Sequence, residues 1–222
     1  MQTVDLEARN ARLTDLIASD ALLEPLATGF QFLEGPVWLP EQGALVFSDI
    51  PGDAIYQWTS EASPPWNRGF SRSSGQREKP ADPKGGWRTA SIPDLQEGIV
   101  GAAVLRRPSH KANGNTLDCQ GCLLTCEHAT SRVVRQELDG RLTVLASHFA
   151  GLELNSPNDI VVRRDGALYF TDPNFGRRNA RYGVPRPQQL AFQAVFRLDP
   201  ASGALVPVAD DFDQPNGLCF SL

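Results

Sequence analysis

From Leu22 onward, apolar positions come in short runs that are separated by Gly, Pro and Asp. Such runs are typical of β-strands, because an amphipathic helix would repeat its apolar positions every three to four residues. The stretch 155–173 shows the pattern most fully: polar residues precede an apolar run, Asp165 and Gly166 follow, and a second run leads to Asp172. An Asp-Gly pair between two apolar runs predicts a β-hairpin.

The same arrangement occurs twice more in the chain. A polar residue leads an apolar run, a turn with Gly follows, and a second run ends in an acid. These hairpins cover 34–49, 113–127 and 155–173, and further strands are expected at 54–58, 132–135 and 194–198. Asn113 and Asn158 are 45 residues apart, and so are Gly121 and Gly166.

A repeat of this length with about four strands is typical of a propeller blade. One four-stranded sheet cannot bury both of its faces, so neighbouring blades must pack together. The sequence therefore predicts an all-β propeller over 21–222 with three to four blades, the fourth beginning at 215–220.

Three segments lie outside this pattern. Residues 1–20 are expected to form an N-terminal helical extension, with the helix over 3–18. Residues 62–98 lack sustained alternation, so we expect a disordered insertion, with a lid formed by Trp66, Phe70 and Trp87 as the alternative. The Pro- and Arg-rich connection 174–191 is expected to hang over one end of the propeller.

Composition narrows the range of partners. The chain has 222 residues, 41% of them apolar, a net charge of −5 and a pI near 5.2. This charge disfavours nucleic acid and anionic membranes, which require a basic face. No apolar run is long enough to span a membrane, and the first residues do not resemble a signal peptide. We therefore expect a soluble, cytoplasmic protein that binds a small molecule.

The cysteines allow two interpretations. Cys119 and Cys122 have the spacing of a zinc site, with Cys126 and His128 as further ligands. The simpler interpretation is that Cys122 and Cys126 act as small apolar side chains on a strand, and that Cys219 is structural.

Polar residues stand just before the first strand of each blade. First strands run outward from a central channel, so these residues should converge on one axis. Any single Asn in a loop is usually a turn former, but the register of the set predicts a ring. One carboxylate with several amide oxygens suits Ca²⁺ or another hard divalent cation. The ring consists of Glu34, Asn113, Asn158 and Asn216.

The chain resembles the gluconolactonase/regucalcin (senescence marker protein) family of six-bladed propeller lactonases, and within it the bacterial and fungal gluconolactonase-like branch. The motifs that carry the resemblance are Glu34-Gly35-Pro36-Val37-Trp38, Phe47-Ser48-Asp49-Ile50-Pro51-Gly52, Ala112-Asn113-Gly114, Thr125-Cys126-Glu127-His128, Ser156-Pro157-Asn158-Asp159, Phe170-Thr171-Asp172-Pro173 and Gln214-Pro215-Asn216-Gly217-Leu218.

The resemblance implies roles for particular residues. Glu34, Asn158 and Asn216 match metal positions, with Ca²⁺ as the expected ion and Zn²⁺, Mg²⁺ or Mn²⁺ as alternatives. Substrate-binding positions are Asn113, Glu127, Asn158 and His128. For His128 the sequence leaves two roles open, orienting Glu127 or a substrate hydroxyl, or a purely structural hydrogen bond. His110 and His148 are expected at the surface.

The expected activity is metal-dependent hydrolysis of a sugar lactone. The metal would act as a Lewis acid on the lactone carbonyl. The catalytic residue stays unknown, because the family's aspartate lies in a Pro-Asp-Gly motif that this sequence lacks and that is expected beyond Leu222. Six blades need about 270 to 300 residues, so the chain would hold about half a ring.

Two other functions stay open. One is an inactive partial propeller that serves as a binding module or is a fragment of the enzyme. The other is a paraoxonase-like arylesterase, which the motifs fit less well.

Overall fold

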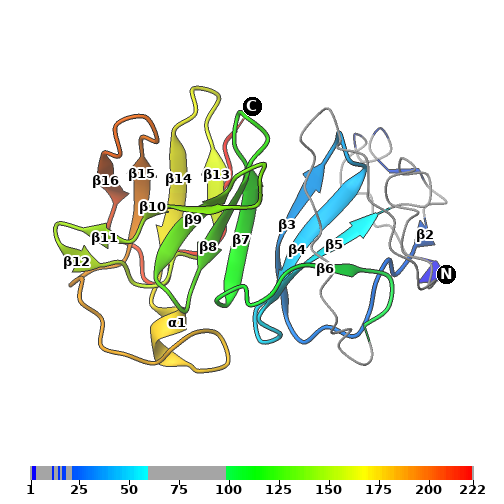
Figure 1. The fold of residues 1–222 in the computed structure, drawn as a ribbon, viewed down its shortest axis with the longest axis horizontal. Helices are drawn as coiled ribbons and strands as arrows, with labels where there is room; N and C mark the ends of the chain where they lie inside the picture. Colours follow the sequence, from blue (N-terminus) through cyan, green and yellow to red (C-terminus); the bar gives the residue numbers. More distant parts are fainter. Residues whose placement is uncertain are drawn as a thin grey trace.

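The computed structural model describes residues 22–59 and 99–221, together with positions 2, 3, 12, 15, 17 and 18. These residues form three four-stranded antiparallel sheets, in each of which every strand pairs with the next one in sequence (Figure 1). The strands, sheet by sheet, are β3 (Leu33–Leu39), β4 (Ala44–Asp49), β5 (Ala54–Thr59) and β6 (Ala103–Arg106); β7 (Ala112–Leu117), β8 (Leu123–Glu127), β9 (Arg132–Gln136) and β10 (Leu142–Ala146); β13 (Ile160–Val162), β14 (Leu168–Asp172), β15 (Ala194–Leu198) and β16 (Leu205–Ala209). The all-β blade pattern predicted from the sequence is confirmed.

The Asp-Gly hairpin is present as β13 and β14. Ile160 pairs with Phe170 and Val162 pairs with Leu168. Gly166 has a φ of +88°, a left-handed conformation that glycine adopts without steric cost. The turn is therefore specified locally by its residue types.

The sheets are arranged around a common axis, as blades of a propeller are. β3 contacts β7, and β7 in turn contacts β13, so the first strands of the three sheets are neighbours. Two apolar cores fill the spaces between sheets. The core between the first and second sheets includes Val46, Ile55 and Leu123, and the core between the second and third includes Val133 and Phe170.

Acids at the ends of second strands hold the segments that enter the sheets. The Asp49 carboxylate accepts hydrogen bonds from the backbone N–H groups of Gln31 and Phe32, each at 3.1 Å. The Asp172 carboxylate accepts one from the N–H of Asn155 at 2.8 Å. These two repeated acids therefore have a structural role in the first and third sheets.

Smaller elements complete the described fold. β1 (Gln2–Thr3) pairs with β2 (Leu22–Leu23), β11 (His148–Phe149) pairs with β12 (Leu152–Glu153), and α1 (Phe175–Arg178) follows β14. No helix among the residues that the structure describes is long and apolar enough to cross a membrane. The predicted insertion 62–98, and nearly all of the predicted helix 3–18, lie outside the described residues.

The segment expected to open a fourth sheet forms no strand. Residues 215–220 nevertheless lie beside the third sheet, where that strand was expected, as the red trace near β13 in Figure 1 shows. The Leu218 N–H donates to Asp159 Oδ2 at 3.2 Å, and the rings of Phe220 and Tyr169 lie 5.2 Å apart. The expected position is confirmed and the expected strand is not, because a strand requires a backbone partner.

Candidate metal and substrate site

The predicted site residues stand where the first strands depart from regular pairing. The register of β3 against β4 shifts between Glu34 and Val37, and that of β7 against β8 shifts between Ala112 and Asn115. Both irregularities are β-bulges, which change the direction of nearby side chains and are common next to functional sites. Glu34 is the last paired residue before the shift in β3, and Asn113 lies within the shift in β7.

Glycines set how closely these strands approach one another. A Cβ on Gly35 would lie 2.2 Å from the backbone oxygen of Asn113, and a Cβ on Gly114 would lie 2.5 Å from the backbone oxygen of Asn158. The Gly114 N–H also donates to that Asn158 oxygen at 2.7 Å. Backbone contacts therefore place Glu34, Asn113 and Asn158 one after another around the axis, as the ring prediction requires.

Asn216 lies in the segment 215–220, beside the third sheet. Its side chain is exposed and makes no hydrogen bond within the described part of the chain. Leu218, two residues later, binds the carboxylate of Asp159, the neighbour of Asn158. The structure thus brings three of the predicted residues together and places the fourth beside them without a side-chain contact.

His128 is buried between the two asparagines. Its ring Nε2 lies 3.2 Å from Asn113 Nδ2 and 3.4 Å from Asn158 Nδ2, and its Nδ1 lies 3.0 Å from the backbone oxygen of Tyr182. Burial lowers the pKa of His128 to about 4, so the ring is neutral near pH 7. The partners of the His128 ring are therefore the candidate site asparagines and the Tyr182 backbone, and not Glu127.

Glu127 does not join this group. Its carboxylate is fully buried and binds Arg132 Nε at 2.6 Å, Thr130 Oγ1 at 2.6 Å and Arg106 at 3.3 Å. Glu127 ends β8, and His128 is the first residue of the turn that follows. The charge of Glu127 is compensated by two arginines, and its substrate-binding role stays a prediction.

Asp159 is a charged neighbour that the sequence reasoning did not select. Its Oδ1 accepts from the N–H of Ile160 at 2.9 Å, and its Oδ2 faces Leu218. Burial raises the pKa of Glu34, and the nearby Asp159 charge raises it further by a smaller amount. The signal for Asp159 was present in the sequence, because it directly follows Asn158.

The oxygen groups fit a hard divalent cation. Glu34 and Asp159 bring two like charges into the same region, and a cation would reduce their repulsion. The remaining donors are amide oxygens, which Ca²⁺ accepts readily and soft metals do not prefer. Among the described residues no group of three or more His, Cys, Asp or Glu could hold a metal. A cation here would therefore rest on Glu34 and amides.

The zinc alternative finds no support in the described cysteines. Cys122 and Cys126 are buried as small apolar side chains, as expected, whereas Cys119 is exposed. Cys219, expected to be structural, is also exposed.

Comparisons with known proteins agree with the fold and the motifs. Residues 32–222 match the family model "SMP-30/Gluconolactonase/LRE-like region". The chain is 27% identical over 211 residues to a gluconolactonase of Zymomonas mobilis subsp. mobilis, covering 95% of this chain and 51% of that protein. It is 31% identical over 84 residues to the lactonohydrolase oryL of Aspergillus oryzae, covering 38% of this chain and 19% of that protein.

A solved structure is also similar to nearly the whole of this chain. XC5397 from Xanthomonas campestris, described as a gluconolactonase, superposes with a TM-score of 0.73 at 33% identity, covering 96% of this chain and 58% of that one. The chain thus spans about half the length of the relatives that it matches from end to end. With the family model matching most of its length, the chain belongs to the SMP-30/gluconolactonase/LRE-like family.

Proposed function

We propose that this chain carries part of the site of a divalent-cation-dependent lactone hydrolase that acts on a sugar lactone such as gluconolactone. The observation that carries the proposal is the convergence of Glu34, Asn113 and Asn158 at the inner ends of three sheets. The names of the Zymomonas and Xanthomonas relatives supply the substrate class.

Each group has a proposed role. Glu34, Asn158 and Asn216 would hold the cation, with Ca²⁺ as the ion that suits a carboxylate and amide oxygens. When bound, the cation would supply Lewis-acid polarisation of the lactone carbonyl and stabilise the developing oxyanion. Asn113 would hydrogen-bond a hydroxyl of the sugar ring and fix its orientation. The base that activates water is not assigned to a residue of this chain.

Hydrolysis of δ-gluconolactone by the purified chain tests the proposal. We expect acid release that stops on chelation with EDTA and returns with Ca²⁺. Glu34→Gln should lower kcat/KM on the order of 100-fold, because it removes the only charged ligand proposed. Glu41→Gln, the same change at an exposed position, is the matched control and should have no effect. Activity that is unchanged by both EDTA and Glu34→Gln would rule the proposal out.

A second candidate function, an association module without turnover, is favoured by a different observation. Apolar side chains are exposed on the first and third sheets: Trp38 is 50% exposed and Val208 is 50% exposed. Such side chains often mark protein contacts. Light scattering discriminates the two, since a monomer that hydrolyses lactone supports the enzyme, and an oligomer without activity supports the module.

A further inference from the structure

His128 connects two sheets and a loop at one point. It follows β8 of the second sheet, and it contacts Asn113 of the same sheet, Asn158 of the third sheet and the Tyr182 backbone in the connection 174–191. Only 1% of His128 is exposed, and Asn113 and Asn158 are 4% and 3% exposed. Water therefore does not replace these contacts.

The chemistry of the ring fixes which atoms donate. The Tyr182 carbonyl can only accept, so His128 Nδ1 carries the proton and donates to it. In a neutral imidazole the other nitrogen then has a free lone pair and no proton. His128 Nε2 is consequently an acceptor, and the groups that face it must be the NH₂ ends of the Asn113 and Asn158 amides.

The orientation of the amides determines what their oxygens can do. With both NH₂ groups turned toward His128, each Oδ1 points away from the ring. Neither Oδ1 accepts a hydrogen bond within the described chain, and neither is among its buried polar atoms that lack a partner. Neither oxygen is therefore occupied by a donor of the described chain, and each is available to a cation or a substrate hydroxyl.

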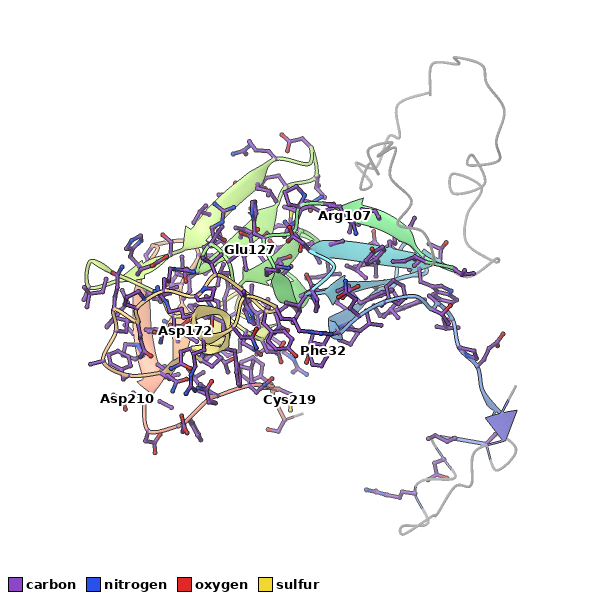
Figure 2. All side chains as sticks on the ribbon, turned by 90° about the horizontal axis from the view of Figure 1, so that it is seen from below. Phe32, Arg107, Glu127, Asp172, Asp210 and Cys219 are labelled. Carbon is purple, nitrogen blue, oxygen red and sulfur yellow. The ribbon has the colours of Figure 1, made fainter. Side chains whose placement is uncertain are left out.

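The carbonyl that fixes the tautomer is itself held in place. Gly176 of α1 packs on His128, since a Cβ there would lie 2.7 Å from the His128 Cβ. Gly183, next to Tyr182, packs on Gly176 in turn, where a Cβ would lie 2.1 Å from the Gly176 oxygen. The Tyr182 ring lies 5.5 Å from that of Phe32, and in Figure 2 Phe32 lies between the ribbon of the first sheet and α1.

We infer that His128 is a positioning residue, held by the Tyr182 carbonyl, which orients the Asn113 and Asn158 amides so that their oxygens serve the cation and the substrate. This inference rests on the function proposed above. His128 itself touches neither cation nor substrate in this scheme. Substitution of a residue that orients a metal ligand typically lowers metal affinity or activity by about 10- to 100-fold.

The tautomer of His128 can be measured without any activity. Nitrogen-15 NMR of the histidine-labelled chain should show His128 protonated at Nδ1 and unprotonated at Nε2. Slow hydrogen exchange of the Asn113 and Asn158 side-chain NH₂ groups should accompany it. Protonation at Nε2 instead would overturn the inference, because both amides would then present oxygen to the ring.

Two substitutions of similar size separate positioning from packing. His128→Gln keeps an acceptor in the buried space, whereas His128→Leu removes it. We expect His128→Leu to weaken Ca²⁺ binding by about tenfold or more, to raise KM for δ-gluconolactone and to speed NH₂ exchange at both asparagines. His128→Gln should retain Ca²⁺ affinity to within about threefold of the original chain. Equal losses of affinity in both variants, in parallel with equal losses of Tm, would overturn the inference.

The two proposals fail in different ways. If the unmodified chain binds no Ca²⁺ and hydrolyses no lactone, the proposed function is wrong. The tautomer and the NH₂ exchange rates still decide whether His128 orients the two amides. If instead the chain is active and His128→Leu leaves Ca²⁺ affinity, KM and exchange unchanged, the proposed function stands and the positioning role is wrong.

Discussion

Burial determines the protonation of Asp172, and with it part of the stability of the third sheet. The residue is fully buried, and desolvation raises its pKa to about 7 despite the N–H of Asn155 and the nearby Arg177 charge. Its Oδ1 has no hydrogen-bond partner among the described groups. In the unfolded chain the same carboxyl has a pKa of about 3.9. Between these two values the folded chain binds more protons than the unfolded one.

This difference predicts a fall in the free energy of unfolding as pH rises from about 4 to about 7, by at most about 4 kcal/mol from this group. Asp172→Asn should flatten that dependence, because the amide stays neutral throughout. Urea unfolding at several pH values measures it. A pH dependence that is identical in the variant would mean that Asp172 is ionised in the folded state.

At the residue scale, sequence reasoning identified the asparagines and could not assign their neighbours. Asn113 and Asn158 were predicted as site residues because they occupy equivalent places in repeats that are 45 residues apart. The role of His128 depends on Tyr182, 54 residues later, in a connection without a repeat. Glu127 and His128 are adjacent in sequence but face different surroundings, and only the fold shows which of them meets the asparagines.

The connection 174–191 is an element that one buried arginine holds in place. Arg177 donates to the backbone oxygens of Asn155, Leu154 and Pro187 at 2.6–2.8 Å and pairs with Glu153 at 2.7 Å. Lysine has one nitrogen in place of the planar guanidinium fork and cannot satisfy all four groups. The position of Tyr182, and therefore of His128, depends on this element.

Arg177→Lys should loosen the connection, because buried carbonyls would lose their donors at about 1–3 kcal/mol each. Trypsin should then cleave faster after the exposed Arg178 and Arg181. Arg164→Lys, an exposed position on the third sheet, is the matched control and should leave cleavage in the connection unchanged. Equal cleavage rates in the two variants would show that Arg177 does not anchor the connection.

At position 114 glycine is required because there is no space for a side chain between the first strands, and not because of the backbone conformation. A Cβ there would lie 2.5 Å from the Asn158 oxygen and 2.7 Å from the Asp159 Cα, and neither backbone atom can move without shifting a strand. Gly140, in the turn between β9 and β10, has a φ of +87° and open space around it.

Gly114→Ala should therefore cost about 3 kcal/mol of stability, at the upper end for overpacking, and should disturb the candidate site. Gly140→Ala should cost about 1 kcal/mol through backbone strain alone and leave ligand binding intact. Chemical denaturation compares the two variants. A smaller loss for Gly114→Ala than for Gly140→Ala would contradict the close packing of β7 against the third sheet.

At the scale of the whole molecule, the sequence predicted the sheets and their order because each hairpin is encoded locally by turn residues and apolar runs. The β-bulges at Glu34 and Asn113 were not predicted, since a bulge arises from the mismatch between two paired strands. The inner ends of the three sheets meet because two apolar cores lie between neighbouring sheets. The central claim is that this meeting creates a cation site.

Calorimetric titration of the purified chain with Ca²⁺ tests that claim most directly. We predict saturable binding of one ion per chain, with the affinity reduced on the order of 100-fold by Glu34→Gln and unchanged by Glu41→Gln. Absence of binding to the unmodified chain, or binding of equal strength in both variants, would contradict a site built on Glu34.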